Sequence, residues 1–225
     1  HFPRYHYGLV IRDGEKTLRK ITPTEESTVR INETYTIDRV GGNAEYKIVT
    51  EYDNEQANLQ RAIFKSSSNE SVSKGYLDFY GKIYPKIKPK EKLNFSDEER
   101  IDKNIFTTTE QYLIENFWTQ NVEDTTQLYV EFYPLVINSF LNNFTSSERK
   151  SPFALQNPVH ILQETTILLP EPWDISPTSY AVDHPCFSFS FSAIASGDHT
   201  IILSYDYLIK KEYVSPEEFP DFFKK

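Results

Sequence analysis

The stretch Cys186–Lys211, CFSFSFSAIASGDHTIILSYDYLIKK, decides the fold of this chain. Its first part alternates phenylalanine with serine, which is the period of a β-strand with one buried and one wet face. After a turn at 195–198, large apolar residues again occupy every second position: Ile201, Leu203, Tyr205, Tyr207 and Ile209. We therefore predict an antiparallel hairpin. Burying each Phe side chain contributes roughly 1.5–3 kcal/mol, so we expect a second layer of the chain to cover the aromatic face.

The same period recurs along the chain. Apolar and polar residues alternate on both sides of the turn cluster at 39–43, which predicts another hairpin. A shorter hairpin is expected around Asp13-Gly14. Including these two hairpins, the strands predicted before residue 170 cover 7–11, 17–21, 29–37, 44–52, 104–118, 128–132 and 159–169.

Helical spacing replaces the strand period between residues 54 and 84. We expect Asn54 to cap a first helix whose apolar face carries Leu59, Ala62 and Ile63. A second helix follows, with apolar residues at helical spacing: Val72, Tyr76, Phe79, Tyr80 and Ile83. Near the C-terminus, the residues 215–218 (SPEE) form a capping box that opens a short helix.

These elements define the fold class and the organisation of the chain. About eight to ten strands without regular strand–helix alternation predict a mainly β, α+β protein. We expect antiparallel, β-sandwich-like sheets with an internal helix pair and a short C-terminal helix. Residues 1–26 form a lead-in segment and residues 27–225 a β-rich domain. Whether 27–95 and 96–225 share one core stays open, with a sub-boundary near 86–96 as the alternative.

Composition excludes several classes of function. The chain has 33 acidic and 24 basic residues and a net charge of −9, which disfavours nucleic acid and anionic membrane surfaces as partners. No apolar run reaches the roughly 20 residues that span a bilayer, so membrane insertion is not expected. The single cysteine permits no internal disulfide. Because the chain begins at His1 and contains no methionine, we expect a processed or excised chain, with any signal peptide upstream.

The best catalytic candidate is the run Asp183-His184-Pro185-Cys186. A cysteine nucleophile needs a base and a group that orients the base, and all three residue types occur here. Adjacent residues on an extended chain point apart, however, and Cys186 opens an alternating strand where a small apolar residue fits. We therefore favour a structural role for Cys186 and expect no catalytic residue and no enzyme activity.

Metal and acid–base sites receive no better support. The five histidines, His1, His6, His160, His184 and His199, show no metal-ligand spacing. The acidic runs at 97–99 and 217–218 are interpreted as solvated faces or helix starts. We expect neither a metal site nor a cofactor.

Trp118 and Trp173 are the candidates for ligand contact. Exposed indoles beside carboxylates could stack on a sugar or a peptide, whereas rings on the apolar face of a strand usually pack in the core. Trp173 follows Pro172 in a loop and is the residue least expected to be buried.

Several segments resemble a known family. The order runs from the hairpin ending at Tyr52, through helices carrying Arg61 and Tyr80, to Tyr84-Pro85. Arg149, Pro152, the strand end at 168–170 and Tyr205-Asp206-Tyr207 complete it. This order resembles the C-terminal region of bacterial transglutaminase-like proteins that carry a domain of unknown function before the core. The resemblance covers nearly the whole chain.

The resemblance implies a non-catalytic module of a periplasmic, outer-envelope or secreted protein. The lead-in at 7–21 resembles the exit from a transglutaminase-like core, which would be the partner of this module in the same polypeptide. The family's nucleophile motif is absent here, so its catalytic residues have no counterpart in this chain. We also expect exposed apolar residues within 1–26 where the core would dock. The alternative is a module that binds a saccharide or a peptide.

Overall fold

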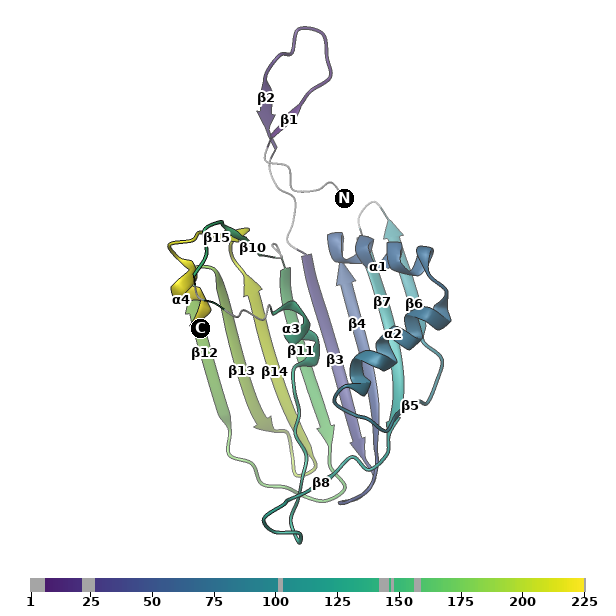
Figure 1. Cartoon of the computed structure of the whole chain (residues 1–225). Coiled ribbons are helices and arrows are strands. Elements are labelled where there is room, and N and C mark those ends of the chain that lie inside the picture. The colour runs from purple at the N-terminus through teal and green to yellow at the C-terminus, as the bar shows by residue number, and fades with distance from the viewer. Residues whose placement is uncertain are drawn as a thin grey trace.

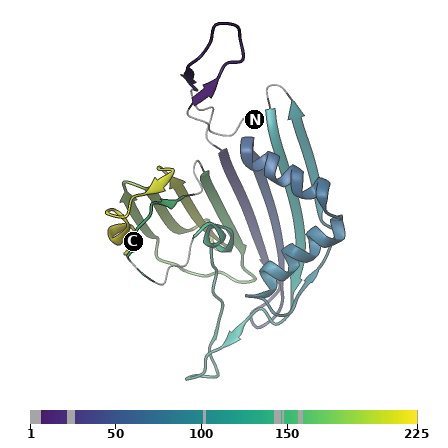
Figure 2. The same cartoon turned by 45° about the horizontal axis from the view of Figure 1, so that its top comes forward.

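The computed structural model describes residues 7–21, 27–100, 103–141, 146, 148–155 and 159–224. Most of this part forms one large sheet, and the helices lie on one of its faces (Figure 1). Figure 2 shows the same arrangement from another direction, with the helix pair crossing the sheet.

Nine strands of the described residues form the large sheet. In spatial order they are β12 (Thr178–His184), β13 (Phe187–Ala195), β14 (Thr200–Ile209), β11 (Val159–Leu168), β3 (Ser27–Ile37), β4 (Ala44–Asp53), β7 (Lys103–Ile114) and β5 (Ile87–Pro89). The ninth, β6 (Asn94–Arg100), also pairs with β7. The strands β3 and β11 run parallel, and the other pairs are antiparallel. Strands from both sides of residues 86–96 therefore belong to one sheet.

The remaining elements of the described residues are short strand pairs and four helices. The pairs are β1 (Tyr7–Leu9) with β2 (Leu18–Lys20), β8 (Thr119–Gln120) with β9 (Leu128–Tyr129), and β10 (Phe153–Ala154) with β15 (Tyr213–Val214). The helices are α1 (Asn54–Ser66), α2 (Asn69–Gly81), α3 (Leu135–Phe140) and α4 (Phe219–Phe223). None of these described helices has the length and apolar character needed to cross a bilayer.

The three predicted hairpins are confirmed. In the deciding stretch, Phe191 of β13 pairs with Tyr205 of β14, and Phe189 pairs with Tyr207. The β-rich α+β class, the internal helix pair and the short terminal helix are confirmed as well. The predicted capping box forms both of its reciprocal bonds, from Glu218 N to Ser215 Oγ (3.3 Å) and from Ser215 N to Glu218 Oε2 (3.2 Å). It closes a turn before the helix rather than opening it, because α4 begins at Phe219 with Glu218 as its N-cap.

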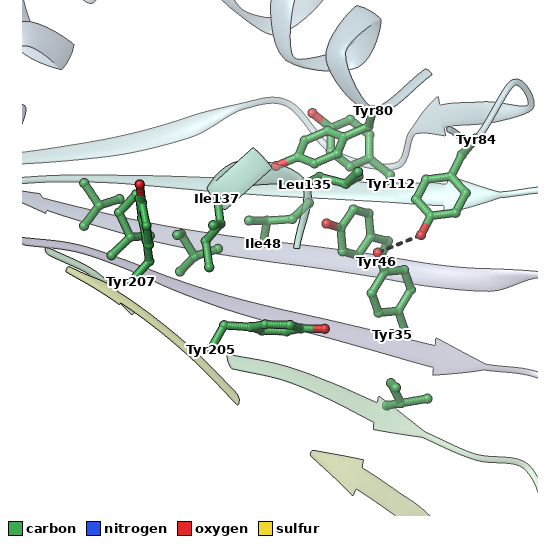
Figure 3. Packing of buried hydrophobic residues seen from close by; sticks show 14 of the residues in the cluster. Tyr35, Tyr46, Ile48, Tyr80, Tyr84, Tyr112, Leu135, Ile137, Tyr205 and Tyr207 are labelled. Carbon is green, nitrogen blue, oxygen red and sulfur yellow. Dashed lines mark hydrogen bonds between the residues drawn. The ribbon is translucent and has the colours of Figure 1, made fainter. Parts of the chain in front are cut away.

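Helices and irregular segments supply the layer over the aromatic face of the sheet. Figure 3 shows Leu135 and Ile137 of α3 and Tyr80 of α2 packed toward the tyrosines of that face. At its centre, the rings of Tyr35 and Tyr46 stack with centroids 4.2 Å apart. Among the described residues, no such layer covers the opposite face, which carries exposed or half-exposed residues on every strand. The apolar residues of the alternating pattern therefore lie on the covered face of the sheet, and the polar residues lie on the open face.

The first helix is rotated relative to its predicted orientation. Its buried residues are Ala57 and Arg61, whereas Leu59 and Ile63 are exposed. The physical reason is a polar anchor, because the Arg61 guanidinium donates three hydrogen bonds of 2.6–3.0 Å to Asp97 on β6. Asp97 is exposed, as expected of a solvated acidic face, but the sequence did not indicate its ion pair with Arg61. The helix also begins after Asp53, so Asn54 is not its cap.

Candidate functional site

Cys186, the candidate nucleophile, is fully buried. Its backbone N–H donates to Nδ1 of His184 (3.1 Å), and Nε2 of the same ring lies 3.3 Å from the Asp221 carboxylate. These contacts assign Nδ1 as acceptor and Nε2 as donor, so both ring nitrogens are occupied. Burial raises the pKa of the Cys186 thiol, although a nucleophilic cysteine must become a thiolate. The arrangement is that of a packed core residue.

Asp183 does not join this pair. Its carboxylate is exposed and forms an ion pair with Lys210, while the neighbouring His184 is buried. Alternation along β12 places the two side chains on opposite faces of the sheet. The sequence run of acid, imidazole and thiol is therefore not a spatial triad.

The other histidines lie apart. His160 Nε2 is 2.9 Å from the Asp206 carboxylate, and His199 Nδ1 is 3.2 Å from the Leu169 carbonyl oxygen. His1 and His6 fall outside the described residues. Within the described ranges, no group of three or more His, Cys, Asp or Glu side chains is arranged to hold a metal ion.

The two tryptophans contact one another. The rings of Trp118 and Trp173 meet edge to face, with centroids 5.7 Å apart, and both pack against the hydrophobic core. Both residues are half-buried, and no group in the described ranges accepts a hydrogen bond from the buried Nε1 of Trp118. The sequence proposed both residues for ligand contact, and the structure brings them together as a pair rather than as an open platform.

Two carboxylates on the covered face were missed by the sequence reasoning. Glu33 on β3 and Glu110 on β7 are only 2% and 4% exposed. Both stand in register with buried residues of an alternating strand, where Glu33 lies between Ile31 and Tyr35. A glutamate at a position where the strand pattern predicts a buried residue could have identified both carboxylates from the sequence, because buried acids are rare unless they are paired or functional.

Glu33 is fully satisfied by its neighbours. The Tyr46 hydroxyl donates to Oε1 (2.5 Å), and Gln163 and Thr165 both donate to Oε2 (2.9 and 2.7 Å). Burial raises the pKa of Glu33, and the three donors act in the opposite direction. Because the donors come from β4 and β11, this carboxylate joins three strands of the sheet. We assign it a structural role.

Glu110 is satisfied on one side only. The Tyr112 hydroxyl donates to Oε2 (2.7 Å). In the described part of the chain, no group donates to Oε1 and no cationic side chain pairs with this carboxylate. Burial raises the pKa of Glu110 to about 7, the Tyr112 hydrogen bond opposes the shift, and the nearby Glu33 charge adds to it.

A pocket of about 520 Å³ opens next to Glu110. It lies between α1, α2 and the sheet, and its inner wall contains Tyr52, Tyr76 and Tyr80. Burial raises the pKa of Tyr52 to about 12, and the Glu110 charge adds to the rise. The Tyr76 hydroxyl donates to Gln60 Oε1 (3.4 Å). This volume and mixture of aromatic and polar walls are typical of small-molecule sites.

Other pockets lie elsewhere on the described part of the chain, and two of them flank strands of the C-terminal half. One of about 650 Å³ lies along β3, β11, β14, β13 and β12, and both polar and apolar side chains line it. The other, of about 370 Å³, is mainly apolar and lies between α3, α4 and β12–β14. Neither contains a buried carboxylate, which distinguishes both from the pocket at Glu110.

The N-terminal hairpin carries a set of exposed apolar side chains. It projects beyond the end of the large sheet (Figure 1). Ile11 is 98% exposed and Leu18 is 64% exposed. We call the exposed apolar side chains of this segment the hairpin patch: Tyr7, Leu9, Val10, Ile11, Leu18 and Ile21. The exposed apolar residues expected within 1–26 are thus present in its described part.

Comparison with known proteins gives one match. The family model DUF3858, described as a domain of unknown function with a solved structure, matches residues 126–224. The matched part contains β11 to β14 and α4 but not β3, β4, β7 or the helix pair. No curated protein and no solved structure matches the chain. The chain is therefore similar to this domain of unknown function over its C-terminal part, which is less than half of its 225 residues.

Proposed function

We propose that this chain is a non-catalytic accessory module of a bacterial envelope or secreted protein. Its partner is a transglutaminase-like domain that precedes it in the same polypeptide, in a periplasmic, outer-envelope or secreted setting. The observation that carries the proposal is the hairpin patch. The order of segments that resembles the transglutaminase-like family supports the choice of partner.

The hairpin patch has the properties of a docking surface. Strands β1 and β2 have three residues each and, within the described part of the chain, pair only with one another. An isolated two-stranded hairpin is marginally stable in water. Contiguous exposed apolar side chains mark interaction sites in stable proteins. Because the hairpin precedes β3, it is the described element nearest to a domain on the N-terminal side. Docking would bury the patch and stabilise the hairpin.

The surroundings of Cys186 support a non-catalytic role. A cysteine nucleophile needs an accessible thiol and a base directed at the sulfur. Here the thiol is buried, and the His184 ring nitrogens contact a backbone amide and a carboxylate. The module would then contribute binding or positioning, and the chemistry would belong to the upstream domain.

A binding experiment tests the proposal. The coding sequence upstream of His1 should specify a domain with separated Cys, His and Asp. We expect that domain, produced separately, to bind this chain. The double variant Ile11→Ser/Leu18→Ser should weaken binding by about tenfold or more, since each residue loses an apolar contact. Val122→Ser is the matched control, because Val122 is 93% exposed but lies outside the hairpin patch.

Two results would reject the proposal. One is unchanged affinity in the double variant, or no binding at all. The other is activity of this chain alone toward glutamine or peptide substrates that disappears in Cys186→Ala. A saccharide- or peptide-binding module remains the alternative, and it predicts that a glycan or peptide changes the fluorescence of Trp118 and Trp173. We favour docking over this alternative, because the two indole rings pack against each other and the core, whereas the side chains of the hairpin patch are exposed.

A further inference from the structure

We propose that the pocket between the helix pair and the sheet binds a small organic cation of the primary ammonium type. The Glu110 carboxylate is the counter-ion of this cation, and the rings of Tyr52, Tyr76 and Tyr80 line the space that the cation occupies. This site is separate from the hairpin patch, so the inference does not depend on the docking proposal.

The first argument is the unequal satisfaction of two buried carboxylates. Glu33 receives three hydrogen bonds distributed over both of its oxygens. Glu110, which is 4% exposed and lines the pocket, receives one hydrogen bond, on Oε2. A buried polar atom normally has a partner, and a buried charge is normally paired. The missing partner of Oε1 is therefore a hydrogen-bond donor that enters from the pocket.

The second argument is the chemistry of the walls. Tyrosine and phenylalanine rings attract cations through their faces, and Tyr52, Tyr76, Phe79 and Tyr80 all line this pocket. A primary ammonium brings three N–H donors and a positive charge, so it satisfies a carboxylate oxygen and the rings together. An anion would meet the Glu110 charge without a compensating cation. The net charge of −9 also attracts cations to the protein.

The third argument is access. Ser67, Ser71 and Gly75 line the mouth of the pocket and are exposed, so a ligand can enter from solvent. Gln56 and Gln60 of α1 line the same space and offer amide groups to the polar part of a larger ligand. The volume of about 520 Å³ accommodates a ligand larger than a simple alkylammonium.

Titration with matched probes tests the site. The whole chain is titrated at pH 8 and constant ionic strength with n-butylammonium chloride and with n-butanol, which has the same number of heavy atoms. Binding is followed by NMR shifts of the backbone amides of Glu110 and Tyr76. We expect saturable binding of butylammonium, and binding of butanol weaker by about tenfold or more because it lacks the charge.

Variants separate the pocket from general charge effects. Glu110→Gln removes the counter-ion and should weaken butylammonium binding by about tenfold or more. Gly75→Leu should do the same by filling the mouth, since a Cβ at this position meets no atom within 4 Å. Leucine is a good helix former, so this second variant tests the site even if Glu110→Gln unfolds. Glu171→Gln changes the net charge equally at an exposed position and should leave binding unchanged.

The outcomes decide the proposal. Butylammonium binding that both pocket variants weaken and Glu171→Gln does not will support it. Equal binding of butanol and butylammonium, full binding by Glu110→Gln, or no saturable shift at Glu110 and Tyr76 in the wild-type chain will overturn it.

Discussion

The hydroxyl of Tyr112 donates a 2.7 Å hydrogen bond to Oε2 of Glu110, two residues earlier on the covered face of β7. This one bond is all that the described part of the chain offers to a carboxylate that is 4% exposed. Burial therefore outweighs hydrogen bonding, and the pKa of Glu110 rises to about 7. The covered face thus contains an acid that titrates near neutral pH.

The raised pKa of Glu110 makes stability depend on pH. Between its ordinary pKa of 4.5 and its folded value of about 7, the folded chain binds more protons than the unfolded chain. The contribution of Glu110 is therefore fully present below pH 4.5 and is lost as the pH rises to about 7. In urea unfolding, the free energy of unfolding of the wild type should fall between pH 4.5 and pH 8 by about 3 kcal/mol more than that of Glu110→Gln. Parallel pH profiles for the two proteins would contradict the assignment.

The Glu33 cluster should respond to loss of a single donor. Thr165→Val keeps the shape of the side chain but removes the 2.7 Å hydrogen bond to Glu33 Oε2. We expect the free energy of unfolding at pH 7 to fall by about 2 kcal/mol, because the acceptor stays buried. Thr107→Val is the control, since Thr107 lies half-exposed on the other face of β7 and should change stability by less than about 0.5 kcal/mol. Equal effects of the two substitutions would show that Glu33 does not depend on Thr165.

Arg61 should be the main polar anchor of α1. It is 5% exposed and donates to Asp97, Asn58 and Asn104, so Arg61→Ala should cost about 3 kcal/mol. Arg30→Ala removes an exposed guanidinium that pairs with Glu51, and it should cost less than about 1 kcal/mol. Chemical denaturation of both variants at pH 7 measures the difference.

The same anchor predicts a pH dependence of opposite sign to that of Glu110. The Arg61 guanidinium lowers the pKa of Asp97 below its ordinary 3.8. Its stabilisation is therefore present above that value and is lost as the pH falls through the lowered pKa. The stability gap between wild type and Arg61→Ala should shrink on acidification below pH 4. A gap that stays constant down to the lowest accessible pH would argue against the ion pair as its source.

The thiol of Cys186 should be unreactive in the folded chain. Because the residue is fully buried and burial raises its thiol pKa, a thiol-specific aromatic disulfide should modify it only through opening of the structure. We expect modification in native buffer to be slower than in denaturant by about 100-fold or more. Rapid labelling of the native protein would show that the thiol is accessible and would support the hypothesis that Cys186 is a catalytic nucleophile.

Local patterns predicted the hairpins and the capping box because each depends on neighbouring residues. In 27–37 and 187–195, successive residues point to the covered and the open face in turn, so the sequence pattern follows the faces of the sheet. Ser215 and Glu218 form hydrogen bonds with each other directly. The strands β6 and β12 were missed, since neither shows an apolar stripe. The parallel pairing of β3 with β11 was also missed, since it joins segments about 130 residues apart and no short-range pattern specifies it.

The candidate site was harder to predict than the fold. Glu33 and Glu110 each occupy a buried position in a strand whose other buried residues are mostly apolar. They differ in the number of hydrogen bonds that they accept, because Tyr46 and Gln163 from neighbouring strands reach Glu33, whereas Glu110 accepts from Tyr112 of its own strand. Gln163 and Thr165 reach Glu33 only because β11 lies beside β3. The rotation of α1 likewise depends on Asp97, 36 residues after Arg61. An amphipathic pattern favours Leu59 and Ile63 as the buried face, and the distant ion pair overrides it.

The most direct test of the Glu110 pocket is the pKa of its carboxyl group, measured by NMR titration of the glutamate side-chain 13C resonances. We predict a value of about 7 for Glu110, a raised value for Glu33, and a fall in the Glu110 value when butylammonium is added, because the cation stabilises the ionised form. A Glu110 carboxyl that titrates at its ordinary 4.5, with or without the cation, would contradict a buried acid that lines the pocket and binds the cation.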